Sequence, residues 1–377
     1  MKSKFKEFFE NEKSGGIVLL LATIFSMVAA NSFLQHSYLN FWNTPLGSHT
    51  LAAWINDGLM AIFFLYIGLE LEREIYKGEL SHLRKASLPI FAALGGMILP
   101  ALIFLSFNLG TATQSGLGIP MATDIAFAIG ILSLLGKRVP LSLKIFLTAL
   151  AVIDDLGAIL VIAAFYTSSL SVVYLLAAMG IFLILIIFNR MHILSLIPYL
   201  AGGLLMWYCM LQSGVHATLA GVLLAFAIPF SSGKKETPSA KLLHILHKPV
   251  SFAILPIFAL ANTALVFNFS ANSLIQPVSL GIICGLFLGK PLGIWLFSFL
   301  SVKLGICKLP GDMQMKHVLG VGFIGGIGFT MSIFITLLAF DSPDLINLSK
   351  IAIIGGSIIS GITGFLWLKM TLKVKLL

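Results

Sequence analysis

Two adjacent carboxylates lie in an otherwise apolar stretch of the chain. Asp154 and Asp155 interrupt the run of aliphatic and small residues from 149 to 159. Neighbours on a helix point about 100° apart, so one carboxylate can face a helix partner while the other faces a cavity. Two like charges in an apolar interior cannot both ionise cheaply. The pair can therefore bind either a proton or a cation near neutral pH, and a structural ion pair with a lysine is the alternative interpretation.

Lys290 is the basic residue best placed to pair with one of these aspartates, because it lies deep in an apolar stretch, within Leu-Gly-Lys-Pro-Leu-Gly. It can neutralise Asp154 structurally or take a direct part in binding. Asp124, preceded by Thr123, follows a glycine- and proline-rich segment. A carboxylate there can offset the positive N-terminal end of a half-helix. A second glycine-rich segment has no acid and ends with Thr330, followed by Ser332.

Further titratable side chains lie near the ends of apolar runs. Glu70, Glu72 and Glu74 follow one such run and indicate either a solvated helix end or a negative mouth that concentrates cations. Asp57, near the start of the same run, is interpreted equally well as lining an exit or as structural. Three histidines can titrate near neutrality, although each alone is more often a hydrogen-bonded bystander. They are His216, His244 and His247.

The elements that hold these residues must cross a membrane. The chain has 377 residues, 58% hydrophobic and 10% charged, with a mean hydropathy of +1.01. Soluble domains carry about 25% charged residues, and a soluble fold this apolar would expose large patches. The net charge of +9 therefore does not predict nucleic-acid binding. The three cysteines have no disulfide or metal-site spacing, and no cofactor is expected.

Apolar runs separated by polar breaks predict an all-α integral membrane protein of twelve spans forming one polytopic domain, because one span needs about 20 apolar residues. The predicted spans are near 14–31, 50–74, 88–108, 116–136, 141–166, 171–190, 195–211, 214–230, 250–268, 277–301, 317–340 and 349–368. With the N-terminus inside, all but three of the 24 lysines and arginines fall in inner segments. The exceptions are Lys144, Lys290 and Lys350. This bias predicts that both termini are cytoplasmic.

Two spans carry unusual backbone signals. The fourth contains Gly-Leu-Gly-Ile-Pro at 116–120, and the eleventh contains a cluster of glycines between 320 and 328. Glycine and proline disfavour a helix interior, although small residues also allow close helix packing in membranes. The threonine that ends each stretch favours broken helices that face a binding site and meet at mid-membrane. Each span is the middle of a three-helix group, about 88–166 and 277–368, and the groups start from opposite sides, as in an inverted repeat.

Five longer motifs surround the residues described above. They are Thr-Asp-Ile-Ala-Phe-Ala from 123, Leu-Thr-Ala-Leu-Ala-Val-Ile-Asp-Asp-Leu-Gly-Ala from 147, Ser-Gly-Val-His-Ala-Thr from 213, Gly-Lys-Pro-Leu-Gly from 289 and Gly-Ile-Gly-Phe-Thr-Met-Ser from 326. Together these motifs resemble the NhaA family of bacterial Na⁺/H⁺ antiporters, over nearly the whole chain from 15 to about 368. The resemblance implies a secondary antiporter of the bacterial inner membrane. Such a protein exports Na⁺ or Li⁺ and imports more than one proton per cation, so it is electrogenic.

The resemblance also implies residue roles. Asp154 and Asp155 match the family's ion- and proton-binding pair, and Lys290 matches the lysine that pairs with the first of them. Matches to other family sites are the broken-helix residues Thr123 and Asp124, and the cytoplasmic acids linked to pH control, Glu70 and Glu74. Well-studied members carry a glutamate immediately before the histidine that aligns with His244, and this chain has Leu243 instead. Members often dimerise through the first outer loop, here about 32–49.

Other transport and enzyme classes fit less well. An intramembrane aspartyl protease needs its two aspartates on different helices, whereas this pair is adjacent. A cation channel builds selectivity from rings of carbonyls or charges, usually by oligomeric symmetry. A single chain with two broken helices and buried titratable carboxylates fits alternating access better. A cation-coupled symporter of a small substrate is the nearest alternative, but the residues around Asp154 are small and aliphatic. Alternating access of bare ions is the preferred interpretation.

Overall fold

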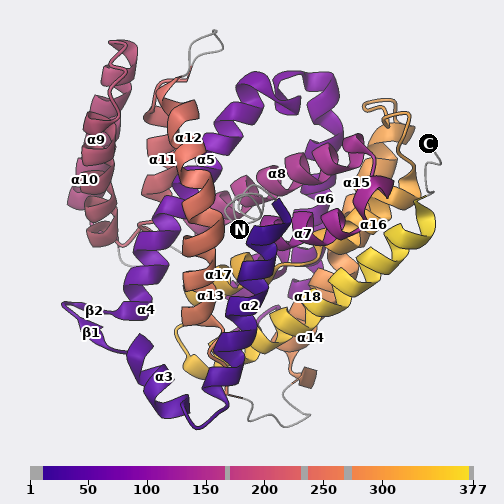
Figure 1. The fold of residues 1–377 in the computed structure, drawn as a ribbon, viewed down its shortest axis with the longest axis horizontal. Coiled ribbons are helices and arrows are strands. Elements are labelled where there is room, and N and C mark those ends of the chain that lie inside the picture. The colour runs from indigo at the N-terminus through magenta and orange to yellow at the C-terminus, as the bar shows by residue number, and fades with distance from the viewer. Residues whose placement is uncertain (1–11, 166–169, 231–236, 267–273, 373–377) are drawn as a thin grey trace, which may run out of the picture. The chain divides into compact units, whose positions relative to one another are not determined.

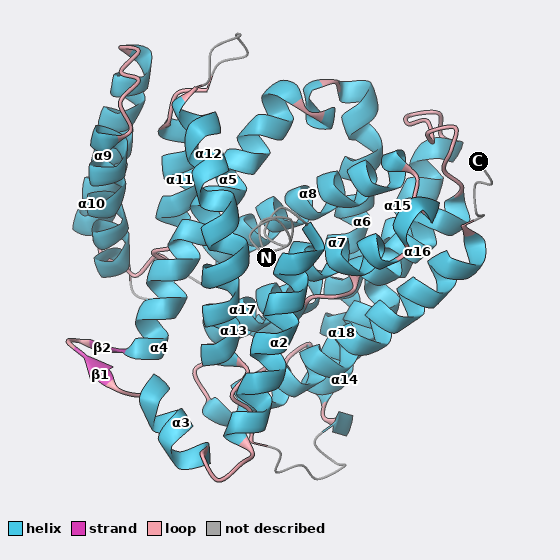
Figure 2. Ribbon diagram, viewed as in Figure 1, coloured by secondary structure: helices cyan, strands magenta, loops and turns pink. Residues whose placement is uncertain are grey.

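The computed structural model describes residues 12–165, 170–230, 237–266 and 274–372, and the described chain is almost entirely helical (Figures 1 and 2). Seven of the lysines on which the predicted orientation rests lie outside the described residues. They are Lys2, Lys4, Lys6, Lys234, Lys235, Lys373 and Lys375. The chain folds into two compact units. Unit 1 holds 1–20, 82–158 and 265–377, and unit 2 holds 21–81 and 159–264.

Unit 1 contains both predicted three-helix groups (Figure 1). The first group comprises α6 (Leu83–Asn108), the 3₁₀ helix η3 (Gln114–Met121), α7 (Ile125–Leu134), η4 (Gly136–Arg138) and most of α8 (Leu141–Phe165). The second comprises α14 (Pro277–Cys284), the π-helical turn η7 (Gly285–Gly289), α15 (Lys290–Lys303), α16 (Met315–Gly325), α17 (Phe329–Ala339) and α18 (Pro343–Thr371).

Unit 2 holds the remaining helices. They are most of α2 (Glu12–Ala30), α3 (Gln35–Trp42), α4 (Leu51–Trp54), the π-helical turn η1 (Ile55–Leu59), α5 (Met60–Lys77), η2 (Glu79–Ser81), α9 (Val172–Arg190), α10 (Ile197–Ser213), α11 (Leu219–Ala227), α12 (Pro238–Pro249), the π-helical turn η5 (Val250–Ile254) and α13 (Leu255–Asn262). The strands β1 (Pro45–Leu46) and β2 (His49–Thr50) form an antiparallel hairpin.

Length and composition qualify eight described helices as membrane spans, and up to ten if each of two bent helix pairs is one span. Every one of the twelve predicted segments carries helix. However, α10 has 17 residues and α11 only nine, which is short for a bilayer of about 30 Å. The multi-pass helical architecture is therefore confirmed, while the number twelve stays a prediction.

The glycine- and proline-rich segments produce the predicted breaks. Residues Gln114–Met121 wind as a 3₁₀ helix, and the chain is extended at Ala122 and Asp124 before α7 begins. In the second group, α16 and α17 are bent by 51° at the break between Gly325 and Phe329. Such irregular backbone is tolerated at membrane depth only where protein or a cavity surrounds it.

Glycines let the helices of unit 1 touch backbone to backbone. A Cβ on Gly95 of α6 would meet the carbonyl group of Gly293 on α15, and a Cβ on Gly293 would meet the carbonyl group of Gly95. This reciprocal contact joins the first helices of the two predicted repeat groups. Small residues commonly allow such close approach between membrane helices.

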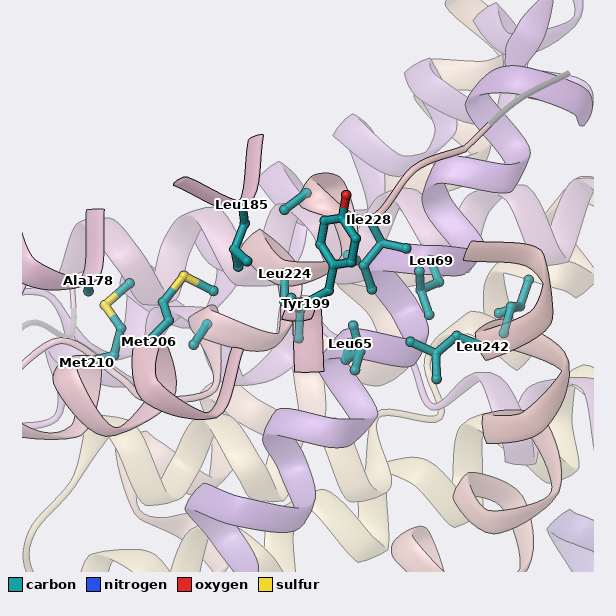
Figure 3. Packing of buried hydrophobic residues seen from close by; sticks show 14 residues of the cluster. Leu65, Leu69, Ala178, Leu185, Tyr199, Met206, Met210, Leu224, Ile228 and Leu242 are labelled. Carbon is teal, nitrogen blue, oxygen red and sulfur yellow. The ribbon is translucent and has the colours of Figure 1, made fainter. Parts of the chain in front are cut away.

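Unit 2 has a conventional apolar core. Leucines from α5, α9, α11 and α12 belong to the same buried cluster as Tyr199 on α10 (Figure 3). The Tyr199 hydroxyl donates to the carbonyl of Ile193 at 3.1 Å, which satisfies its polar atom. Leu243 belongs to this core and is 8% exposed, so the position where the resembled family carries an acid is filled here by a packed apolar side chain.

Candidate functional site

Three segments of unit 1 converge on Asp154. The carboxylate lies on α8 and is fully buried, and its Oδ2 accepts from Lys290 Nζ at 2.6 Å and from Thr123 Oγ1 at 2.9 Å. Lys290 also donates to the carbonyl of Met121, the last residue of η3. The lysine therefore bridges the aspartate and the carbonyl end of a broken span, and the predicted pairing of Lys290 with Asp154 is present.

The π-helical turn η7 immediately precedes Lys290 and helps to place it. A π turn inserts one extra residue and rotates everything that follows it, and such turns are frequent at functional sites. Two glycines in η7 allow the close approach, because a Cβ on Gly285 would lie 2.6 Å from Cβ of Pro120 and one on Gly289 would lie 2.7 Å from Cα of Pro100.

Thr123 stands between Asp154 and the second broken span. Its hydroxyl oxygen lies 2.9 Å from Asp154 Oδ2 and 2.9 Å from the carbonyl oxygen of Gly325, at the end of α16. A hydroxyl has one proton to donate, so only one of these two acceptors receives it at a time.

Asp124 joins the two breaks. Its Oδ1 accepts from the amide of Phe127 at 3.0 Å and caps α7. Its Oδ2 accepts from the amide of Thr330 at 3.1 Å and from the Thr330 hydroxyl. The amide of Asp124 donates in turn to the carbonyl of Ile327 at 2.6 Å. One carboxylate therefore caps two half-helices, and the predicted proximity of Asp124, Thr123 and Thr330 to the break is present.

Asp155, the neighbour of Asp154, is also fully buried. The second oxygen of Asp154, Oδ1, has no hydrogen-bond partner within the described part of the chain. It faces Gly96, where an added Cβ would lie 3.8 Å away. Asp124, Asp154 and Asp155 thus bring three carboxyl groups into the interior of unit 1, where Lys290 pairs with Asp154. Burying ionised carboxylates is costly, so bound protons or a cation would lower the charge of this cluster.

The predicted acidic mouth lies in unit 2. The guanidinium of Arg73 contacts Glu70 at 3.2 Å and Glu74 at 3.1 Å. The hydroxyl of Tyr66 lies 3.0 Å from Nδ1 of His247 on α12. His244 on the same helix is exposed. Glu70 and Glu74 are thus joined through Arg73 on α5, and His247 of α12 is joined to Tyr66 of α5, whereas no contact of the His244 side chain joins it to them within the described residues.

The sequence predicts that Glu72, with Glu70 and Glu74, is part of either a solvated helix end or a negative mouth that concentrates cations. The structure instead buries it to 5% exposure and gives it a hydrogen bond, because Ser239 Oγ donates to its Oε2 at 2.8 Å. The position of Glu72 along the helix predicts this burial. Glu72 follows the core residues Leu65 and Leu69 by seven and three positions, and residues at these spacings lie on one face of a helix.

Asp57 and His216 lie elsewhere in unit 2, and both are half-buried. Asp57 sits in the π-helical turn η1, where its backbone carbonyl accepts from Trp207 Nε1 at 3.1 Å. The backbone carbonyl of His216 accepts from the amide of Leu219 at 3.1 Å at the start of α11. Their predicted roles on the outer side stay predictions.

Comparisons with known proteins place the chain among cation exchangers. A family model described as Na⁺/H⁺ antiporter 1 matches residues 6–368. A Na⁺/H⁺ antiporter NhaA of Flavobacterium psychrophilum is 63% identical, covering 98% of this chain and 96% of the relative. A Na⁺/H⁺ antiporter NhaA of Dechloromonas aromatica is 58% identical, covering 98% and 96%. The sodium proton antiporter MjNhaP1 of Methanocaldococcus jannaschii is 17% identical with a TM-score of 0.53, covering 95% and 92%, which shows a shared fold.

Proposed function

The chain belongs to the Na⁺/H⁺ antiporter family, and we propose that it exchanges the two ions at the buried pair Asp154–Asp155. The protein is a transporter rather than an enzyme. The observation that carries the proposal is the burial of two adjacent carboxylates, of which Asp154 forms an ion pair with the fully buried Lys290. A proton or a Na⁺ ion can each lower the negative charge of this pair, and binding one removes the need for the other.

Each side chain has a distinct part in this proposal. Asp155 and Oδ1 of Asp154 offer negative oxygens to the cation. Lys290 holds the other oxygen of Asp154 at 2.6 Å, which keeps that carboxylate from being a bare charge when the cation leaves. Thr123 turns its hydroxyl between Asp154 and Gly325 and so follows the occupancy of the site. Asp124 and Thr330 keep the two half-helix ends in contact.

Two protons are exchanged for one Na⁺ if both aspartates take up a proton when the site is open to one side of the membrane, and both release their protons when Na⁺ binds from the other side. One net charge then crosses the membrane in each cycle, which makes the exchange electrogenic. Alternating access comes from movement of the two inverted groups, about 88–166 and 277–368. Li⁺ is a second substrate, because it carries the same charge and binds oxygen ligands.

The bacterial inner membrane is the proposed location, with both termini cytoplasmic, and lipid is the surrounding medium. Unit 2 exposes a stretch from about 32 to 49 that includes α3 and the β1–β2 hairpin, where Trp54 Nε1 donates to the carbonyl of Leu46 at 2.8 Å. A homodimer through this stretch is part of the proposal, and the edges of a two-stranded hairpin, which can pair with another chain, support it.

The test replaces Asp155 by Asn in purified protein reconstituted into vesicles that hold a proton gradient. The change keeps the shape and one carbonyl oxygen but removes the cycling proton. We expect Na⁺ and Li⁺ to dissipate the gradient with the parent protein and not with Asp155→Asn. Asp312→Asn is the matched control, because Asp312 is an exposed aspartate of unit 1 that accepts a hydrogen bond from Ser142. Normal exchange by Asp155→Asn would refute the proposal.

A further inference from the structure

The N-terminus of α17 is the half-helix end that approaches Asp124, and its own sequence provides no cap. The first amides of a helix have no partner inside the helix, and a Ser, Thr, Asp or Asn at the N-cap usually satisfies them. The N-cap here is Gly328. A Cβ on Gly328 would collide with Ser332 Oγ and would lie 3.0 Å from Leu286. A capping side chain at this position would therefore have to displace Ser332 Oγ, which donates to the carbonyl of Ile119 at 2.7 Å.

Two residues from other helices supply the missing acceptors. Ser357 Oγ on α18 accepts from the amide of Phe329 at 3.2 Å, and Asp124 Oδ2 accepts from the next amide, that of Thr330, at 3.1 Å. Ser357, Phe329 and Thr330 are 5%, 6% and 1% exposed. Solvent therefore cannot readily replace either acceptor, and both caps are delivered from outside the helix.

The contact with Ser357 depends on how closely α18 approaches the second break. A Cβ on Gly361 would lie 3.3 Å from Ile327 Cδ1, and a Cβ on Gly364 would lie 2.9 Å from the backbone nitrogen of Ile324. Ile327 is the residue whose carbonyl accepts from the amide of Asp124. The face of α18 that carries Ser357 thus packs against residues 324–327, the segment that is hydrogen-bonded to the backbone of Asp124.

We propose that Ser357 is a positioning residue for cation exchange, which caps α17 from α18 and thereby fixes the crossing of the two broken spans. Without its hydroxyl, the Phe329 amide is left buried and without an acceptor, a loss that costs free energy comparable to a hydrogen bond. The first turn of α17 then loosens, and the contacts of Thr330 and Ile327 with Asp124 loosen with it. Thr123, next to Asp124, contacts Asp154 directly, so the effect reaches the ion site, and the inference rests on the proposed function of that site.

The test compares Ser357→Ala, Ser357→Thr and the matched control Ser360→Ala in vesicles. Ser360 lies one turn further along α18, is fully buried and donates to the carbonyl of Leu286 at 3.4 Å rather than capping a helix. We expect Ser357→Ala to raise the apparent Na⁺ constant at least about threefold, the factor for one weakened hydrogen bond, while the maximum rate stays close to that of the parent. The threonine variant keeps an acceptor and is expected to restore the constant. Ser360→Ala is expected to leave it unchanged.

Hydrogen–deuterium exchange of the peptide covering 323–334 separates this inference from the function of the aspartates. Ser357→Ala should increase deuterium uptake at the start of α17, whether or not Asp154 and Asp155 bind the ions. Parent-like uptake together with a parent-like Na⁺ constant would overturn the role of Ser357. The role of Ser357 would also be overturned if Ser360→Ala changed the deuterium uptake and the apparent Na⁺ constant as much as Ser357→Ala does. Exchange that survives Asp155→Asn, with the Ser357 effects intact, would instead refute only the aspartate assignment.

Discussion

Lys290 Nζ lies 2.6 Å from Asp154 Oδ2, and neither side chain has any exposed surface. The lysine belongs to the first helix of one predicted repeat group, and the aspartate belongs to the last helix of the other. Because Lys290 also donates to the carbonyl of Met121, its charge ties α8, α15 and the broken fourth span together. This pair is therefore a structural tie as well as a part of the proposed ion site.

Replacing Lys290 by Ala should destabilise the protein more than it blocks ion binding. Removal of one member of a buried pair leaves the other uncompensated, a loss of about 3–5 kcal/mol in soluble proteins. The measurement is the thermal aggregation temperature in detergent, beside transport at low temperature. A variant as heat-stable as the parent would count against a structural role.

Gly95→Ala should also destabilise unit 1, because its methyl group would enter the carbonyl group of Gly293 on α15. Overpacking of this kind costs about 1–3 kcal/mol, and a backbone obstacle cannot rotate away. Gly180→Ala on α9 is the control, because nothing lies within 4 Å of the added methyl group and alanine favours a helix by up to about 1 kcal/mol. Equal aggregation temperatures for the two variants would mean that the α6 and α15 backbones do not touch.

Sequence reasoning succeeded where membrane energetics allow few solutions. Ionisable side chains in membrane spans face the protein interior and pair with one another or with backbone carbonyls, so the position of Lys290 in an apolar stretch predicts a pairing with Asp154. The position of Thr123 between Asp154 and Gly325 does not, because it depends on the angle at which two broken spans cross. The π-helical turns at 55–59, 250–254 and 285–289 were not predicted either, since in largely apolar spans few polar positions reveal the phase shift that one extra residue causes.

The ninth predicted span shows a different limit. The sequence places it at 250–268, but helix begins at Pro238 and the α-helical part ends at Asn262. The polar residues of α12, among them His244, resemble a loop when read by hydropathy. They are the outer face of an amphipathic helix whose other face carries Leu242 and Leu243 into the core of unit 2. Residues 267 and 268 lie outside the described part of the chain.

Leu243→Glu tests whether the acid of related proteins fits this core. Leu243 packs in one cluster with buried leucines of α5 and α11. Burying an unpaired charge is costly, so we expect Leu243→Glu to lower the aggregation temperature more than Leu243→Ala at neutral pH. The difference between the two should shrink on acidification, because the introduced carboxyl is then neutral. A glutamate variant that is more stable than the alanine variant at every pH would show that a partner for the acid is present.

Competition between protons and Na⁺ gives the last prediction. If both ligands share Asp154 and Asp155, each bound proton removes a charge that the cation needs, so the apparent Na⁺ affinity must fall as the pH falls. The limit is about tenfold per pH unit for each competing proton. Transport should therefore stop at acidic pH through the site itself, although Leu243 replaces the acid of the family's pH-linked cluster, and added Na⁺ should restore much of the rate. The measurement is the apparent Na⁺ constant in vesicles at several pH values. A constant that stays flat while the maximum rate collapses would exclude a shared site and require a separate pH gate, for which Glu72 and its contact with Ser239 would be the first residues to replace.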